Sequence, residues 1–210
     1  TTKIEQNSDA IKLQAKSITE TSNKVDNLQI GGRNLLRNSS SFTDWNNSGG
    51  WKITKDDSHS TISCSTSNST SLNLYSMYSK KVNMNLLLNQ NFTLSFDLKV
   101  DDWSKWDIPS PVILEYYNAN NARIYYHDTY LSDSFVKIKG DKKNGEWVKV
   151  VLTKKGDLSN MNIGVDNVTL NDVKFFGVRF ALFKNGSIHI RKPKLEIGTI
   201  STDWTPAPED

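Results

Sequence analysis

The chain has 210 residues, which suits one large domain or one domain with an appendage, and no apolar stretch approaches the ~18 residues of a membrane span, so no membrane insertion is expected. Its 26 Lys and Arg against 23 Asp and Glu leave a net charge of +3, which argues against a nucleic-acid partner held by a dense basic face. A single cysteine excludes a disulfide framework and a zinc site with several cysteines.

The composition is polar and yet rich in large rings. Ser, Thr and Asn make up about 30% of the chain, while aromatic residues reach 10% and include six Trp. This combination indicates a β-rich protein. Because the first residue is Thr1 rather than Met, we expect the sequence to be a piece of a longer protein.

Residues 1–30 contain no aromatic residue, Pro or Gly, and they show a strict seven-residue period. The a positions hold Ile4, Ile11, Ile18 and Val25, and the d positions hold Asn7, Gln14, Thr21 and Leu28. This pattern predicts a helical coiled-coil stalk that ends at Gly31-Gly32. Polar d positions favour a parallel homotrimer, because three chains can share a central polar layer. The alternative is a single amphipathic helix packed on its own domain.

From residue 31 to residue 210 the period changes to two, which predicts strands with one buried and one wet face. The clearest strands are 92–100 and 173–184. Further candidates are 51–54, 61–65, 71–75, 112–117, 123–127, 135–139, 147–153 and 187–191. Asn185-Gly186 between two such segments predicts a hairpin. About ten short strands without βαβ units predict a mainly β domain, a jelly-roll β-sandwich of two sheets.

Both edges of this domain carry a family resemblance. The opening run Gly31-Gly32-Arg33-Asn34-Leu35-Leu36-Arg37-Asn38 resembles the entry strand of jelly-roll carbohydrate-binding modules of the family 4/9-like group. The segments 190–196 and 202–210 resemble the end of such modules in tail and baseplate proteins of phages that infect Gram-positive bacteria.

The resemblance implies a location in the phage virion and sugar binding. The implied partners are host cell-wall or capsular polysaccharide, further copies of the chain, and other tail or baseplate proteins. No cofactor is required, but modules of this type often hold a structural calcium ion near the first and last strands. Glu196 and Asp203 lie in the right region to supply oxygen ligands.

Two tryptophans occupy a charged loop directly after the clearest strand. Trp103 and Trp106 lie in the run 101–107, where core residues are not expected. Flat apolar rings stack on the C–H-rich face of a pyranose, so these residues are candidates for carbohydrate binding. The alternative is that both rings anchor the loop over the edge of the sandwich.

A second candidate cluster lies on the strands 112–117 and 123–127. Neighbouring residues of a strand point to opposite faces, so the alternation predicts one polar and aromatic patch on one sheet. Its members are Glu115, Tyr117, Arg123 and Tyr125, joined by Arg179 if that strand is adjacent. Arg179 then either meets a ligand or forms a structural ion pair with a carboxylate such as Glu115.

The remaining features indicate structure rather than chemistry. Trp45, Trp51, Trp147 and Trp204 are expected in the core or at its edges. A carboxylate pair for glycoside cleavage would combine Glu115 with Asp97 or Asp128, but no catalytic motif accompanies it. We therefore expect a non-catalytic carbohydrate-binding module of a phage receptor-binding protein. The alternative is a spacer or decoration domain of a trimeric tail fibre without a sugar site.

Overall fold

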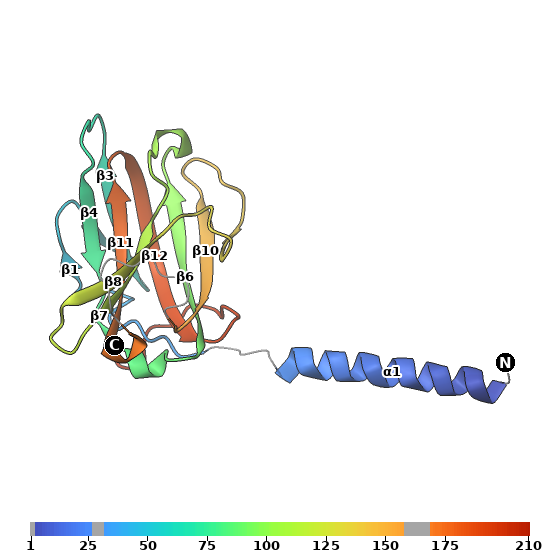
Figure 1. The fold of residues 1–210 in the computed structure, drawn as a ribbon. Helices are drawn as coiled ribbons and strands as arrows, with labels where there is room; N and C mark the ends of the chain where they lie inside the picture. The colour runs from blue at the N-terminus through green and yellow to red at the C-terminus, as the bar shows by residue number, and fades with distance from the viewer. Residues whose placement is uncertain (1–2, 27–31, 158–168) are drawn as a thin grey trace.

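A computed structural model describes residues 3–26, 32–157 and 169–210 (Figure 1). Helix α1 (Lys3–Asp26) precedes a sandwich of two antiparallel sheets and extends away from it. The predicted mainly β fold with a β-sandwich is confirmed. None of the described helices is long and apolar enough to cross a membrane.

The first sheet has the strand order β1-β4-β11-β7-β8, and β5 also pairs with β11. Its strands are β1 (Asn46–Asn47), β4 (Leu74–Tyr78), β5 (Val82–Asn83), β7 (Val112–Tyr117), β8 (Arg123–Thr129) and β11 (Phe175–Phe183). The strand expected at 71–75 begins three residues later than predicted. The very short strands β1 and β5 were not predicted, because two residues cannot show an alternation.

The second sheet has the strand order β2-β3-β12-β6-β10-β9. Its strands are β2 (Lys52–Lys55), β3 (Ser60–Thr66), β6 (Asn91–Val100), β9 (Val136–Lys139), β10 (Trp147–Lys155) and β12 (Gly186–Ile197). Three short 3₁₀ helices complete the described elements: η1 (Met84–Leu86), η2 (Trp103–Lys105) and η3 (Leu170–Asp172).

The predicted Asn185-Gly186 hairpin is wrong. Strand β11 belongs to the first sheet and β12 to the second, so this turn carries the chain from one sheet to the other. A two-residue I′ hairpin needs positive φ at both central residues. Here φ is positive at Lys184 (57°) and Gly186 (150°), on either side of Asn185. The Asn-Gly pair alone cannot distinguish these two kinds of turn.

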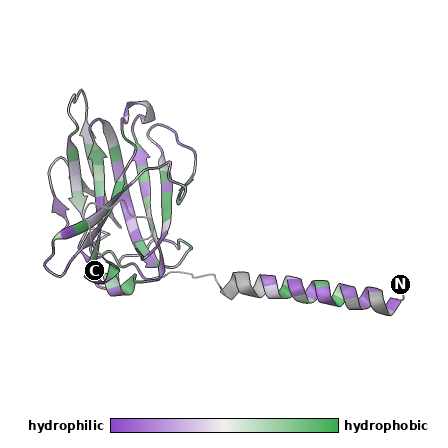
Figure 2. Ribbon diagram, in the orientation of Figure 1, coloured by the Kyte–Doolittle hydropathy of each residue, from purple (hydrophilic) through white to green (hydrophobic). Residues whose placement is uncertain are grey.

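The core lies between the two sheets, as the alternation of green and purple along the strands in Figure 2 illustrates. Phe96 of β6 meets Phe180 of β11 with ring centroids 5.1 Å apart, and Phe92 meets Phe176 at 5.3 Å. The outward residues of β6 alternate with these rings, as the period of two predicts. The central strands therefore have one apolar face that the opposite sheet covers, whereas β1 and β2 at the sheet edges are exposed along their length.

Four tryptophans are expected in the core or at its edges, and this prediction is partly confirmed. Trp45 and Trp51 are buried in the core. Trp204 is half-buried, and its indole N–H donates to the carbonyl of Pro193 at 3.2 Å. Trp147 is not a core residue: it pairs with Lys99 on the outer face of the second sheet, while its neighbour Val148 points inward. A Trp at the start of a strand does not indicate whether the odd-numbered or the even-numbered residues of that strand point toward the core.

The opening segment is tied to the end of the chain by the buried Asn34. Its amide donates to the carbonyls of Pro193 and Thr205 at 3.1 and 3.0 Å, and its side-chain oxygen accepts from the backbone N–H of Leu36 and Leu195. One side chain thus satisfies four backbone groups at the point where the first and last segments of the sandwich meet. These contacts account for a fully buried Asn in the opening segment.

Helix α1 does not bury its apolar residues on the sandwich. Ile11, Leu13 and Ile18 are 64%, 71% and 69% exposed, and Figures 1 and 2 show the helix extending away from the sheets. The side chains of Ile4 and Val25, together with Leu28 and Gly31, lie outside the described residues. The alternative of a helix packed on its own domain is therefore wrong in this structure, while the coiled coil and the domain boundaries 1–30 and 31–210 stay predictions.

Candidate functional site

The outer face of the first sheet gathers rings and charged groups from four adjacent strands. We call it the tyrosine face, and its members are Tyr78 on β4, Arg179 on β11, Glu115 and Tyr117 on β7, and Arg123, Tyr126 and Asp128 on β8. The register places Arg179 beside Tyr78, and Glu115 beside Tyr126. The structure thus brings together four of the residues predicted for this patch: Glu115, Tyr117, Arg123 and Arg179.

Glu115 is the centre of the tyrosine face, with 1% of its surface exposed. One carboxylate oxygen accepts from Arg123 Nη1 at 2.8 Å and lies 3.3 Å from Arg179 Nη2, while the other accepts from the Tyr117 hydroxyl at 2.5 Å. Arg179 also donates to the Tyr78 hydroxyl at 3.0 Å. The alternative of a structural ion pair between Arg179 and Glu115 is therefore correct, and this pair holds two tyrosines and Arg123 in place.

Tyr125 is not part of the tyrosine face, which corrects the prediction. A β-bulge shifts the pairing of β7 and β8, so that Tyr117 faces Arg123 but Tyr116 faces Tyr125. The extra residue reverses the alternation after Arg123 and turns Tyr125 into the core, where it is 3% exposed. Tyr126 takes its place: it is 39% exposed, and the Arg123 guanidinium lies 5.0 Å from its ring centroid.

The three rings of the tyrosine face, Tyr78, Tyr117 and Tyr126, differ in their exposure to solvent. Tyr117 lies against Gly177, where an added Cβ would be 3.1 Å from the ring, and the Lys81 ammonium lies 3.8 Å from its ring centroid. Tyr78 and Tyr126 each have one guanidinium nearby, and Tyr126 is the most exposed of the three. The accessible groups for a ligand are therefore Tyr126, part of Tyr78, and the 42%-exposed side chain of Arg123.

Asp128 gives the tyrosine face a testable dependence on pH. Burial raises the pKa of its carboxyl above the ordinary 3.8, although Arg179 and Arg123 oppose the shift. A carboxyl whose pKa is higher in the folded than in the unfolded chain destabilises the fold increasingly as the pH rises through the folded pKa. Asp128→Asn is therefore expected to be more stable than the wild type at pH 7, with a difference that shrinks toward about pH 4. Thermal unfolding across this range measures it, and a less stable variant at pH 7 would contradict the account.

The loop 101–107 packs its two tryptophan rings against the protein rather than exposing them to a ligand. Trp106 is 5% exposed and lies against Gly186, where an added Cβ would come within 2.8 Å of the indole. Trp103 is half-buried, lies 5.9 Å from Trp106 and donates its indole N–H to the carbonyl of Lys143. The prediction that Trp106 binds a sugar is wrong, because its ring is covered. Both rings serve as the loop anchors of the alternative.

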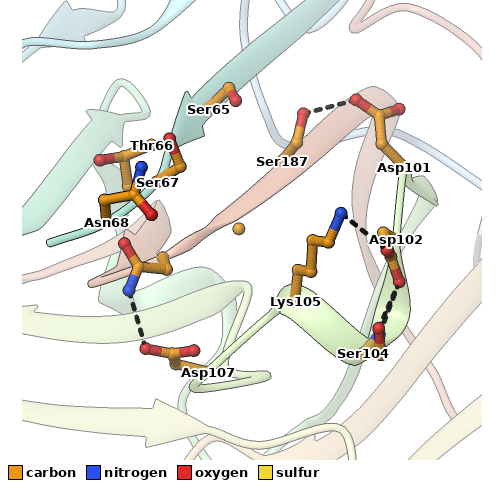
Figure 3. A pocket seen from close by; sticks show the side chains of 12 residues that line it. Ser65, Thr66, Ser67, Asn68, Asp101, Asp102, Ser104, Lys105, Asp107 and Ser187 are labelled. Atoms are coloured by element: carbon orange, nitrogen blue, oxygen red, sulfur yellow. Dashed lines mark hydrogen bonds and ion pairs between the residues drawn. The ribbon is translucent and has the colours of Figure 1, made fainter.

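The polar residues of the same loop form one wall of a pocket of about 530 Å³ at the end of the sandwich (Figure 3). We call it the loop pocket, and it is lined by 65–68, Asp101, Asp102, Ser104, Lys105, Asp107 and 185–187. Hydrogen bonds from Lys184 and Asn185 lower the pKa of Asp107, so this carboxylate is ionised and fixed. The pocket offers hydroxyl, amide and carboxylate groups for a polyol, but no aromatic ring lines it.

The residues expected to hold calcium do not fit that ion. The buried ammonium of Lys194 donates to the Thr202 hydroxyl at 2.6 Å and to the carbonyl of Asp203 at 2.7 Å, and it lies 3.6 Å from Glu196. Glu196 in turn accepts from both the backbone N–H and the hydroxyl of Thr202. The Lys194 ammonium thus occupies the position next to these oxygens that a metal ion would need. In the described parts of the chain, no three His, Cys, Asp or Glu residues gather as metal ligands.

Stability is accordingly expected to be independent of divalent ions. The melting temperature in EDTA and in millimolar calcium should agree within about 1 °C, because an ion that binds only the folded state would raise it with concentration. Calorimetry in both buffers checks this. A rise of several degrees with calcium would show a metal site that the Lys194 contacts do not explain.

The structure separates one of the two carboxylate pairs considered for catalysis. Asp97 lies on the outer face of the second sheet, bound to Arg191 at 3.0 Å, whereas Glu115 lies on the outer face of the first. Asp128 does share the tyrosine face with Glu115. However, Glu115 is enclosed by Arg123 and Arg179, so it lacks the open position that a general acid or nucleophile needs.

No family model and no curated protein matches the chain. Three solved structures are similar to it in fold. The enzymatically active domain of tailspike protein 4 of bacteriophage CBA120 matches 78% of this chain and 21% of its own, with 10% identity and a TM-score of 0.49. This chain thus spans about a fifth of that tailspike structure.

The other two are a carbohydrate-binding module and a phage baseplate component. The CBM22-1 xylan-binding domain of Xyn10C from Paenibacillus barcinonensis matches 82% of this chain and 99% of its own, with 11% identity and a TM-score of 0.45. The tripod of the bacteriophage Tuc2009 baseplate matches 87% of this chain and 60% of its own, with 16% identity and a TM-score of 0.42. These likenesses concern the fold alone.

Proposed function

We propose that the chain is a non-catalytic carbohydrate-binding domain of the jelly-roll type in a phage tail protein, and that it attaches the virion to host cell-wall or capsular polysaccharide. The observation that supports this function is the tyrosine face. It combines an exposed ring with charged groups that a buried carboxylate holds in fixed positions. Sugar recognition needs this combination of a flat apolar surface and oriented polar groups.

Each side chain has a distinct part in the proposed binding. The ring of Tyr126 stacks on the C–H-rich face of a pyranose, while the exposed side chain of Arg123 donates to its hydroxyls. Glu115 does not touch the sugar: it fixes Arg123, whose Nη1 it binds at 2.8 Å. Because these groups are held before the ligand arrives, little ordering is required on binding. The face is open, so a single site binds weakly.

A binding assay on the full chain tests this function. Purified cell walls of Gram-positive bacteria are incubated with the protein before and after periodate oxidation, which cleaves vicinal diols of sugars. We expect binding that periodate abolishes, and no release of reducing sugar during prolonged incubation. Binding to no wall or capsular preparation would favour a spacer domain instead. Released reducing ends would contradict the non-catalytic assignment.

The proposed function includes a trimeric stalk built from helix α1. Ile11 and Ile18 lie seven residues apart on this helix, and the β-sandwich of the same chain leaves both exposed. Burial between three helices would remove them from water. Three linked sites would then raise the affinity for a polymer by avidity.

The oligomeric state checks the stalk. Light scattering is expected to give about three chains per particle for the wild type and one chain for Ile11→Asn/Ile18→Asn, since polar residues at both positions disrupt the seam. Leu13→Asn is the matched control, because Leu13 is equally exposed but lies off the seam, and it should remain trimeric. A monomeric wild type would leave the stalk without support.

A further inference from the structure

The outer face of the second sheet carries a tryptophan among cations, on the opposite side of the sandwich from the tyrosine face. One row across four strands reads Arg191, Asp97, Lys149 and Lys139, from β12 through β6 and β10 to β9. The next row reads His189, Lys99 and Trp147. We call these residues the Trp147 face.

Arg191 is held in a fixed position on the Trp147 face. Its guanidinium carbon lies 4.0 Å from the Trp147 ring centroid, and its Nε donates to Asp97 at 3.0 Å. Among the described contacts, neither terminal nitrogen of Arg191 has a partner. A guanidinium that is stacked on one side and bound through Nε presents its two terminal N–H groups as a fork. Such a fork matches the two oxygens of a carboxylate or a phosphate.

Cationic side chains outnumber carboxylates around this fork. Lys137 and Lys139 of β9 and Lys149 of β10 occupy outward positions, since Val136, Ile138 and Val150 between them pack toward the core. The Lys99 ammonium lies 5.5 Å from the ring centroid of Trp147. Within the two rows, Asp97 is the only carboxylate, and Arg191 already binds it. A second carboxylate, Asp101, borders the rows and lies 2.9 Å from His189 Nε2. A chain whose net charge is +3 therefore concentrates five cationic side chains on one sheet face.

We propose that the Trp147 face is a second binding site, which takes an anionic polysaccharide. The fork of Arg191 binds a carboxylate or phosphate of the polymer, Lys149 and Lys139 bind the next acidic groups, and the free part of the Trp147 ring contacts a sugar. The ring favours a saccharide over a bare lipid surface, which would need exposed apolar residues around it. The small number of cations and the central Asp97 are unfavourable for a duplex nucleic acid.

This site is independent of the proposed function at the tyrosine face, because the two lie on opposite faces of the sandwich. A polymer that bears both neutral and acidic sugars can therefore be bound on both sides. Each site should respond to its own variants: Tyr126→Ala affects neutral oligosaccharides, and Arg191→Gln affects acidic ones.

Titration of the full chain with defined polymers tests the proposal. The probes are polygalacturonate for carboxylates, poly(glycerol phosphate) teichoic acid for phosphates, and dextran as the neutral polymer, each at low and at physiological salt. We expect at least one polyanion to bind, with an affinity that falls with salt, and Arg191→Gln to weaken it about tenfold or more. The polyanion that binds tighter identifies the acidic group.

Three controls keep the result specific. Lys12→Gln removes the same charge from the distant helix α1 and should change the affinity less than twofold. Tyr126→Ala should leave polyanion binding intact. Lys139→Gln/Lys149→Gln, which lacks the exposed cation of Lys139 and the half-buried cation of Lys149 and keeps the Arg191 contacts, repeats the test if Arg191→Gln fails to fold. The proposal is overturned if the wild type binds neither polyanion, if Arg191→Gln and Lys12→Gln lose affinity equally, or if duplex DNA or anionic lipid vesicles bind as tightly.

Discussion

Replacing Glu115 with alanine is expected to lower the free energy of unfolding by about 3–5 kcal/mol, because it leaves the buried Arg179 without its counter-charge. Arg179 is 6% exposed and its Nη2 lies 3.3 Å from Glu115. The variant also removes the acceptor of the Tyr117 hydroxyl and of Arg123. Urea unfolding of the full chain, followed by tryptophan fluorescence, measures the loss.

Two further variants separate the buried pair from the exposed part of the network. Arg123→Gln should cost no more than about 1 kcal/mol, because its side chain is 42% exposed and solvent screens the pair. The double variant Glu115→Leu/Arg179→Leu should recover most of the stability, since paired apolar residues need no counter-charge. A loss below about 1 kcal/mol for Glu115→Ala would contradict the central role of this carboxylate.

Replacing Tyr126 with alanine is expected to weaken binding of a neutral oligosaccharide about tenfold or more, while the stability changes little. The ring is the most exposed of the tyrosine face and the platform on which the sugar stacks in the proposed function. Tyr126→Phe should retain most of the affinity, because the flat ring remains. Isothermal titration with an oligosaccharide from a wall that binds the protein measures both.

Tyr130 offers a matched control for this prediction. It is 42% exposed, close to the value for Tyr126, but it follows the end of β8 and lies outside the tyrosine face. Tyr130→Ala should therefore bind as the wild type does. Equal losses for Tyr126→Ala and Tyr130→Ala would mean that the sugar is not held on the tyrosine face.

The alternation of apolar residues predicts most of the sandwich because the central strands have one face in the core. Segment 92–100 illustrates this: its even positions hold buried apolar residues and its odd positions hold polar residues, and strand β6 begins within one residue of the predicted start. The parity of 112–117 likewise places Glu115 and Tyr117 together on an outer face. These features follow from local geometry, which the sequence records directly.

Other features depend on contacts that no local pattern contains. The bulge that exchanges Tyr125 for Tyr126 adds one residue without changing the composition of the strand. The outward position of Trp147 depends on whether the first sheet covers the odd-numbered or the even-numbered residues of β10. The competition of Lys194 for the expected calcium ligands requires the segment 202–203 to fold back against strand β12. Such tertiary arrangements decide which of the predicted residues are free to bind a ligand.

Hydrogen–deuterium exchange of the full chain with and without a bound oligosaccharide tests the central claim most directly. The account predicts slower exchange in peptides that cover β4, β7 and β8, which carry Tyr78, Tyr117 and Tyr126 respectively. Peptides from the loop pocket at 65–68 and 101–107 should exchange at the same rate in both samples. Protection confined to the loop pocket, with no change in β4, β7 and β8, would contradict carbohydrate binding at the tyrosine face.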